Sequence, residues 1–155
     1  MTPVPGPYPA RPVDIRLATT DDVDRIAEIG LPFIELTGIV TSKGEIADGL
    51  RTMMDAGVQA FVAVEDGAVE GVLIFSLYRP WFAPRTAFAS EMAWWVNPKH
   101  RGTAGLRLLT AFEQWARAND AQPTLSELVG ISEVDSILSR RNYRLTERAY
   151  VKEVI

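Results

Sequence analysis

Hydrophobic and polar residues change their spacing along this chain, and the spacing predicts alternating strands and helices. Alternating or continuous apolar runs of strand length occupy residues 13–18, 61–64, 69–78, 88–96 and 123–129, and a final extended segment covers 143–155. Apolar residues three and four positions apart predict helices that begin near residues 20, 42, 105 and 132. The resulting order is β-α-α-β-β-β-α-β-α-β, which predicts an α/β fold with a mixed sheet and helices on both faces.

Residues with known positional preferences mark where several of these elements begin and end. Thr20 is expected to cap the first helix, Ser42 or Thr41 the second, and Ser132 the last. Pro32 is expected to kink or interrupt the first helix. Asp66 and Gly67 suit a tight hairpin turn between two strands.

Length and composition restrict the class of protein. The 155 residues, 47% hydrophobic and 23% charged, suit one globular domain, which we place at residues 13–155 after a flexible Pro-rich arm at 1–12. The absence of Cys excludes disulfides, a thiolate nucleophile and a thiolate metal site. A net charge of −4 without long basic runs argues against a nucleic-acid surface, and no apolar run is long enough for a membrane helix. We therefore expect a cytoplasmic enzyme or small binding domain.

The most informative stretch runs from Ser90 to Ala118. An apolar strand ends at Asn97 and Pro98, a short basic turn with two glycines follows, and a strongly periodic helix comes next. The free N–H groups and the positive dipole end of such a helix form a ready anion site. The stretch therefore predicts a phosphate-bearing ligand. The chain contains neither the Walker sequence nor the Gly-x-Gly-x-x-Gly sequence that mark nucleotide-binding proteins of other kinds.

The element order, the Val96–Gly102 sequence VNPKHRG and the Leu-rich helix after it resemble the GNAT superfamily of acyl-CoA N-acyltransferases. The ending from Asn142 to Glu153 is also similar to the last turn and strand of that family, and the whole is most similar to small single-domain members from bacteria and their phages. The resemblance implies a GNAT-like, mostly antiparallel twisted sheet. It also implies that acetyl-CoA is the co-substrate, with no metal.

Coenzyme A contacts are implied for two segments by this resemblance. The turn after the fourth strand binds the pyrophosphate through backbone amides, and the main chain of that strand pairs with the pantetheine arm. The family pattern would have Gly at 104 and Gly or Ala at 106, where this chain has Ala and Leu; a reading shifted to His100 places Gly105 at the last glycine position. Either reading suggests a turn one residue shorter than usual. The cofactor-binding candidates are Trp94, Trp95, Val96, His100, Arg101, Gly102, Thr103, Ala104, Gly105, Leu106 and Ser132.

Acyl transfer to an amine requires a neutral nucleophile, stabilisation of the oxyanion and a proton for the thiolate. Glu91 on the fourth strand is our first candidate for the general base, and Glu127 on the next strand is the second. Strand alternation places Glu91 on one face with Ala93 and Trp95. Burial there would raise the pKa of its carboxyl toward the range of a general base, whereas in solvent or in an ion pair it would be a structural residue.

The proton donor for the thiolate has no obvious candidate. Many family members have a Tyr on the helix after the fifth strand, and this chain has Leu138 at that position. Ser139 or a water molecule could serve, and Tyr143 is expected in the core.

The basic residues of the turn have structural and functional readings. His100, the only histidine, is expected to be a solvated loop residue near the pyrophosphate, and its being alone excludes multi-histidine metal sites. Lys99, Arg101 and Arg107 could supplement phosphate binding or be solvated charges.

The sequence leaves two functions open. The first is direct transfer of an acetyl group from acetyl-CoA to an amine in a ternary complex, without a covalent enzyme intermediate. The second is a coenzyme A-binding sensor or interaction module without activity, which the missing Tyr and the shortened turn motivate. Acceptor contacts are expected from residues 31–43, 79–85 and the last strand, and dimerisation through the last strand or the aromatic loop is left open.

Overall fold

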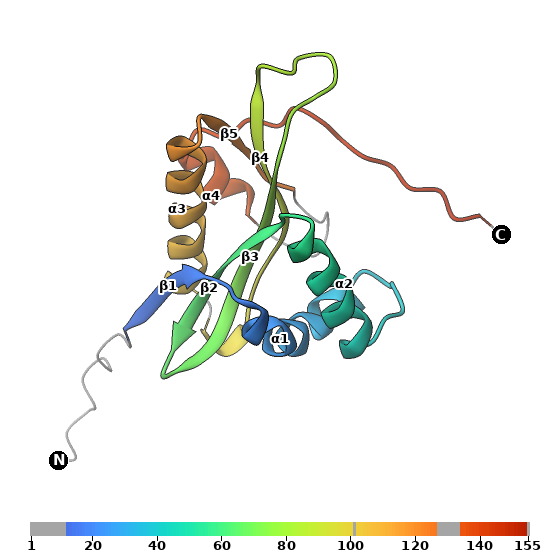
Figure 1. The fold of residues 1–155 in the computed structure, drawn as a ribbon, viewed down its shortest axis with the longest axis vertical. Coiled ribbons are helices and arrows are strands. Elements are labelled where there is room, and N and C mark those ends of the chain that lie inside the picture. Colours follow the sequence, from blue (N-terminus) through green and yellow to red (C-terminus); the bar gives the residue numbers. More distant parts are fainter. Residues whose placement is uncertain (1–11, 101, 127–133, 155) are drawn as a thin grey trace.

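The computed structural model describes residues 12–100, 102–126 and 134–154, and the fold is built on a five-stranded sheet (Figure 1). The strands lie in the order β1-β2-β3-β4-β5, antiparallel up to β4, while β5 pairs with β4 in parallel. This confirms the mixed, mostly antiparallel sheet. The strands are β1 (Val13–Leu17), β2 (Gln59–Glu65), β3 (Ala68–Tyr78), β4 (Ala87–Val96) and β5 (Ala121–Thr124).

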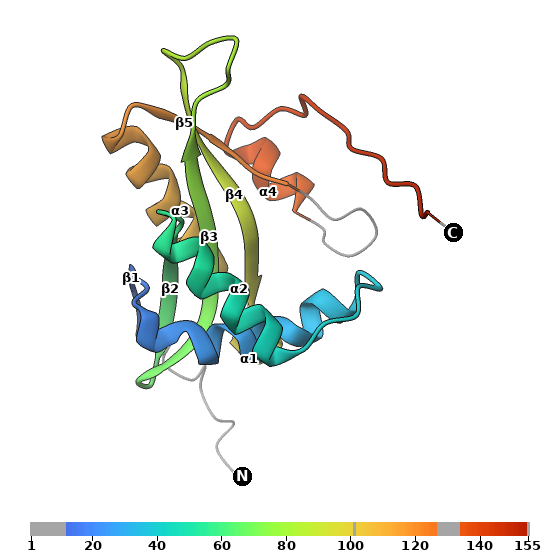
Figure 2. The ribbon, with the colours of Figure 1, turned by 45° about the vertical axis from the view of Figure 1, so that its right-hand side comes forward.

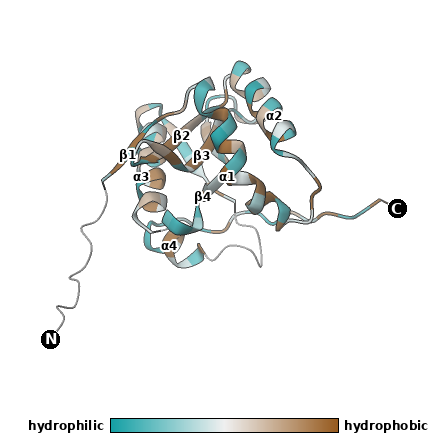
Figure 3. Ribbon diagram, turned by 90° about the horizontal axis from the view of Figure 1, so that it is seen from below, coloured by the Kyte–Doolittle hydropathy of each residue, from teal (hydrophilic) through white to brown (hydrophobic). Residues whose placement is uncertain are grey.

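Helices cover both faces of this sheet, as predicted (Figure 2). They are α1 (Val23–Glu35), α2 (Lys43–Asp55), α3 (Thr103–Ala118) and α4 (Asp135–Arg140), with short 3-10 helices η1 (Thr20–Asp22) and η2 (Pro98–His100). The amphipathic character of the longer helices, visible as brown and teal positions in Figure 3, explains the two layers. None of the helices in the described ranges is both long and apolar enough to cross a membrane.

Two hydrophobic clusters result, one on each face. The cluster on the α3 face centres on Phe75 and Phe112, whose ring centroids are 5.3 Å apart, and α4 adds Ile137 and Leu138 to it. The cluster on the α1 and α2 face includes Ile26 and Trp95. Together the two clusters hold the middle of β4 between two helical layers.

Local signals explain several boundaries. The Ser42 side chain accepts a hydrogen bond from the Glu45 N–H at 3.2 Å, which confirms one of the two predicted caps. Asp66 and Gly67 have φ of 50° and 78°, as the predicted hairpin turn requires. The first helical turn is capped by Thr19 rather than Thr20, and α1 continues past Pro32 to Glu35.

The structure corrects the C-terminal part of the predicted order. Residues 143–154 form no strand and are mostly exposed, and Figure 1 shows them running away from the sheet. Strand propensity needs a pairing partner, and β5 is a poor one because it has four residues and Pro123 lacks an N–H donor. Also, β5 begins at Ala121, two residues earlier than predicted, and α4 has Val134 at its N-cap position. The predicted cap Ser132 and nearly all of the Pro-rich arm lie outside the described residues.

Candidate active site at the split between β4 and β5

The parallel strands β4 and β5 pair only along part of β4. Their register runs from Ala87–Ala121 to Ser90–Thr124 and, within the described residues, ends there. The Thr124 hydroxyl donates a hydrogen bond of 3.1 Å to the Ser90 hydroxyl at this last pair. On the edge of β4 that faces β5, the backbone groups from Met92 to Val96 lie beyond the β5 ladder, so an extended ligand can bond there.

A β-bulge interrupts β4 at the same place. Ile74 of β3 pairs with Ala93, but the next residue, Phe75, pairs with Glu91, so Met92 is the extra residue. Residues paired directly across a ladder share a face, which puts Glu91 with Phe75 on the α3 face. The prediction that Glu91 shares a face with Ala93 and Trp95 is therefore wrong. Strict alternation does not survive an inserted residue.

Glu91 is a buried carboxylic acid that pairs with no cationic side chain of the described residues. The residue is 8% exposed, and the backbone N–H of Ser126 donates a hydrogen bond of 2.9 Å to its Oε2. Burial raises the pKa of the Glu91 carboxyl to about 7, although the Ser126 hydrogen bond acts in the opposite direction. A carboxyl with this pKa at the apex of the strand split can accept a proton near neutral pH.

The turn after β4 leads into α3 two residues earlier than predicted. The helix begins at Thr103, and the Leu106 N–H bonds to the Gly102 carbonyl, so the N–H groups of Thr103, Ala104 and Gly105 belong to the first turn and have no backbone partner among the described residues. Gly102 has φ of 112°, a conformation that favours glycine. A side chain at Gly105 would make only ordinary contacts, the nearest at 3.6 Å from Val96. The turn therefore fits a phosphate group bound by main-chain amides.

The side chains of Trp94, Trp95 and Val96 contribute packing. Trp94 and Val96 pack on the α3 face, whereas Trp95 is buried on the α1 face. The Trp95 ring lies against Gly30 of α1, where an added Cβ would come within 2.2 Å of it. Because the side chains of this part of β4 pack into the clusters on both faces of the sheet, its main-chain groups are the part available to a ligand.

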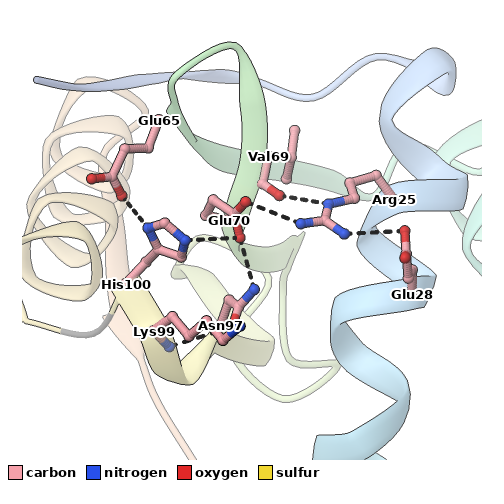
Figure 4. Close-up of polar contacts among 8 residues, drawn as sticks. All are labelled: Arg25, Glu28, Glu65, Val69, Glu70, Asn97, Lys99 and His100. Atoms are coloured by element: carbon pink, nitrogen blue, oxygen red, sulfur yellow. Dashed lines mark hydrogen bonds and ion pairs between the residues drawn. The ribbon is translucent and has the colours of Figure 1, made fainter. Parts of the chain in front are cut away.

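His100 is held by two carboxylates, which corrects the expectation of a solvated side chain. Its Nδ1 lies 2.5 Å from Glu65 Oε2, and its Nε2 lies 3.6 Å from Glu70 Oε2 (Figure 4). Neither Glu65 nor Glu70 was among the residues predicted from the sequence. They lie 35 and 30 positions before His100 on other strands, and no local pattern marks such a pairing.

The other candidates are scattered. Arg107 donates a hydrogen bond from its Nη1 to the Val13 carbonyl of β1, and the Lys99 side chain is exposed. Ser139 is exposed on α4, whereas Leu138 packs against the core. Tyr143 is half-buried, and its hydroxyl donates a hydrogen bond of 3.2 Å to Glu113. Arg101, Glu127 and Ser132 lie outside the described residues.

No three His, Asp or Glu side chains in the described ranges gather in a way that could hold a metal ion.

Comparisons with known proteins agree on one family. No curated protein matches the sequence. Among solved structures, a ribosomal-protein-alanine N-acetyltransferase from Brucella melitensis is 18% identical, with a TM-score of 0.76 over 92% of this chain and 99% of its own. A predicted acetyltransferase from Clostridium acetobutylicum, solved with acetyl-CoA, is 11% identical, with a TM-score of 0.70 over 91% and 96% of the two chains. These likenesses show the fold.

The family itself is shown by the sequence. The profile of the acetyltransferase (GNAT) family matches residues 35–144, which is more than half of the chain and includes the β4 bulge, the turn and α3. The chain belongs to the GNAT family of acetyltransferases.

Proposed function

We propose that this protein transfers an acetyl group from acetyl-CoA directly to an amine, with Glu91 as the general base. The observation that carries the proposal is the position of Glu91. It is a buried carboxyl with a pKa of about 7 at the apex of the β4–β5 split, on the strand that leads into the free amides of α3. Perturbed carboxyls without a charge partner are concentrated at functional sites.

The cofactor side of the site uses main-chain groups. The N–H groups of Thr103, Ala104 and Gly105 would hold the pyrophosphate, with the dipole of the 16-residue helix α3 adding to the attraction. The unpaired backbone of Trp94–Val96 would bond to the pantetheine arm as a further strand would. The similar fold of the Clostridium acetobutylicum acetyltransferase, which was solved with acetyl-CoA, supports this choice of ligand.

The chemistry at the apex requires one proton acceptor and one oxyanion donor. Glu91 takes a proton from the acceptor ammonium, so that the neutral nitrogen attacks the thioester carbon. A backbone N–H of β4 beside the bulge donates to the carbonyl oxygen as negative charge develops on it. Attack forms the C–N bond and a tetrahedral intermediate, which collapses as the C–S bond breaks and the thiolate leaves with the bonding electrons. The second proton that the nitrogen loses passes to the thiolate through water or through the Ser139 hydroxyl, which gives one proton and takes one up.

The acceptor is expected to contact exposed apolar residues in two loops. The β3–β4 loop presents Trp81 and Phe82, 90% and 73% exposed, and the segment after α1 presents Leu36, Ile39 and Val40. The carboxylates of Glu35, Glu45 and Asp48, close in sequence to this second segment, would favour a cationic amine. An amine acceptor is protonated in solution, so it carries the positive charge that these carboxylates would attract.

The test begins with calorimetric titration of acetyl-CoA, with ADP and desulfo-CoA as comparison ligands, followed by turnover measurements on a library of amines. Micromolar binding of acetyl-CoA and release of free thiol with at least one amine would support the proposal. Absence of binding in folded, coenzyme-free protein would overturn it. Binding without turnover of any amine would favour the inactive coenzyme A sensor, for which the packed Leu138 at the usual Tyr position is the structural argument.

A further inference from the structure

The turn that precedes α3 is held by a network of partly buried polar side chains that the proposed reaction does not use. Its central member is Glu70 of β3, which is 8% exposed. Asn97, just after β4, donates two hydrogen bonds to Glu70, from its side chain to the carboxylate at 2.9 Å and from its backbone N–H to the carbonyl at 2.7 Å. Arg25 of α1 donates to the other carboxylate oxygen of Glu70 at 3.0 Å and to the Val69 carbonyl at 3.0 Å.

His100 extends this network to the end of the turn. Its ring lies between Glu65 and Glu70, and the side chains of His100, Glu65 and Glu70 are only 20%, 12% and 10% exposed (Figure 4). The His100 backbone N–H also donates to the Asn97 carbonyl at 2.8 Å, which closes η2. α3 begins at Thr103, three residues later, so the anchored ring is close in sequence to the first turn of that helix.

We propose that His100 is a positioning residue for phosphate binding, with Glu65 as its anchor. The proposal rests on the proposed function, because it concerns the same amide turn. The Nδ1–Glu65 contact fastens the turn to the β2–β3 hairpin, so the amides of Thr103, Ala104 and Gly105 are ordered before the ligand arrives. Ordering of a binding loop in advance lowers the cost of association.

The His100–Glu65 contact also affects the negative charge near the proposed phosphate site. Glu65 and Glu70 are two largely buried carboxylates close to a site for an anion, and both would repel a pyrophosphate. Among the described residues, the charged groups drawn around the ring in Figure 4 are Glu65 on β2, Glu70 on β3, Arg25 and Glu28 on α1, and the neighbouring Lys99. By donating a hydrogen bond from Nδ1, the imidazole holds the Glu65 carboxylate at the β2–β3 hairpin.

The test compares ligands with and without phosphate. Calorimetric affinities of coenzyme A, ADP and pantetheine are measured for the wild type, His100→Ala, His100→Asn, Glu65→Ala and the double variant, with Asp24→Asn as a control for loss of an exposed carboxylate. We expect His100→Ala to weaken coenzyme A and ADP about tenfold, the effect of one lost hydrogen bond, and to leave pantetheine unchanged. His100→Asn keeps a donor near the Nδ1 position and should restore most of the affinity.

The double variant separates positioning from simple charge. If His100 acts through Glu65, the double variant binds ADP no more weakly than His100→Ala, because the contact is already lost. Additive losses, or equal losses for pantetheine, would overturn the proposal. So would unchanged coenzyme A affinity in His100→Ala. Should that variant fail to fold, Glu65→Ala decides the question, because the proposal expects it to weaken ADP binding and to leave pantetheine binding unchanged. Failure of the wild type to bind coenzyme A would instead contradict the proposed function.

Discussion

Buried carboxylates have different hydrogen-bond partners on the two faces of the sheet. Three are buried in the described part of the chain, Asp22, Glu70 and Glu91. Asp22, at the start of α1, receives two hydrogen bonds from Arg16 at 2.8 and 2.9 Å, and Glu70 receives one from Arg25. Glu91, at the strand split, receives a backbone N–H from Ser126 and, within the described residues, pairs with no arginine or lysine.

The pKa values follow this difference. The Arg16 guanidinium holds the pKa of the Asp22 carboxyl below its usual range, whereas burial raises the pKa of Glu91 to about 7. A paired carboxylate stabilises the fold when ionised, and an unpaired one destabilises it. The carboxylates near α1 therefore contribute to stability through ion pairs, whereas Glu91 at the strand split is buried at a cost in stability, as we expect of the proposed general base.

The largest expected effect is on activity. Glu91→Gln should lower kcat about 10²- to 10⁴-fold, because the amide cannot accept the ammonium proton, and should leave acetyl-CoA affinity within about twofold. Thiol release and calorimetry measure the two quantities. Glu127→Gln is the matched variant at the second candidate base. A large loss of kcat in Glu127→Gln and a small one in Glu91→Gln would reverse the assignment.

The next effect is on stability as a function of pH. Because the folded pKa of Glu91 is about 7 and its ordinary value is 4.5, ionisation penalises the folded state from about pH 4.5 upward and fully above about pH 7. The advantage of Glu91→Gln over the wild type in free energy of unfolding should therefore rise by about 3 kcal/mol between pH 4 and pH 8. Urea unfolding across this range measures it. An advantage independent of pH would mean that the Glu91 carboxyl titrates normally.

Much of this arrangement could be predicted from the sequence because its signals are local. The apolar runs, Ser42 and the Asp66–Gly67 turn indicated the order of the first nine elements of the prediction, and the basic turn before α3 led to the proposed anion site. Glu91 was identified as a candidate base that burial would perturb. Its face was wrong, because an extra residue such as Met92 leaves no mark in the pattern and is defined only by pairing with β3.

Non-local partners could not be predicted. The Glu65–His100 contact joins residues 35 positions apart, and His100 has ordinary loop surroundings in sequence. The prediction of a final strand was wrong because a non-local partner is absent from the described part of the chain. The alternation at 143–155 is compatible with a strand, but the edge strands of the sheet, β1 and β5, have only five and four residues, and neither pairs with this segment in the described residues. Both errors concern contacts with parts of the chain that are distant in sequence.

A smaller effect is expected at the paired carboxylate. Asp22→Asn should lower the free energy of unfolding by about 2 kcal/mol at pH 7, because it weakens charged hydrogen bonds from Arg16. With its pKa lowered, Asp22 contributes stability above its unfolded pKa and loses it as pH falls, so the difference should shrink in acid. Asp24→Asn is the control, since the Asp24 side chain is 70% exposed in its pair with Arg51. Equal losses in the two variants would contradict the distinction.

The smallest expected effect lies within the Arg25 network. Glu28 and Glu70 both pair with Arg25, at 3.1 and 3.0 Å, but the Glu28 side chain is 54% exposed and that of Glu70 is 10% exposed. Glu28→Gln should change the free energy of unfolding by less than about 0.5 kcal/mol, because water replaces the lost interaction. Glu70→Gln should cost about 2 kcal/mol, since the arginine and Asn97 lose a charged acceptor away from water. Urea unfolding at neutral pH compares them, and a loss in Glu28→Gln as large as that in Glu70→Gln would show that charge alone, without burial, makes a carboxylate structural on this face of the sheet.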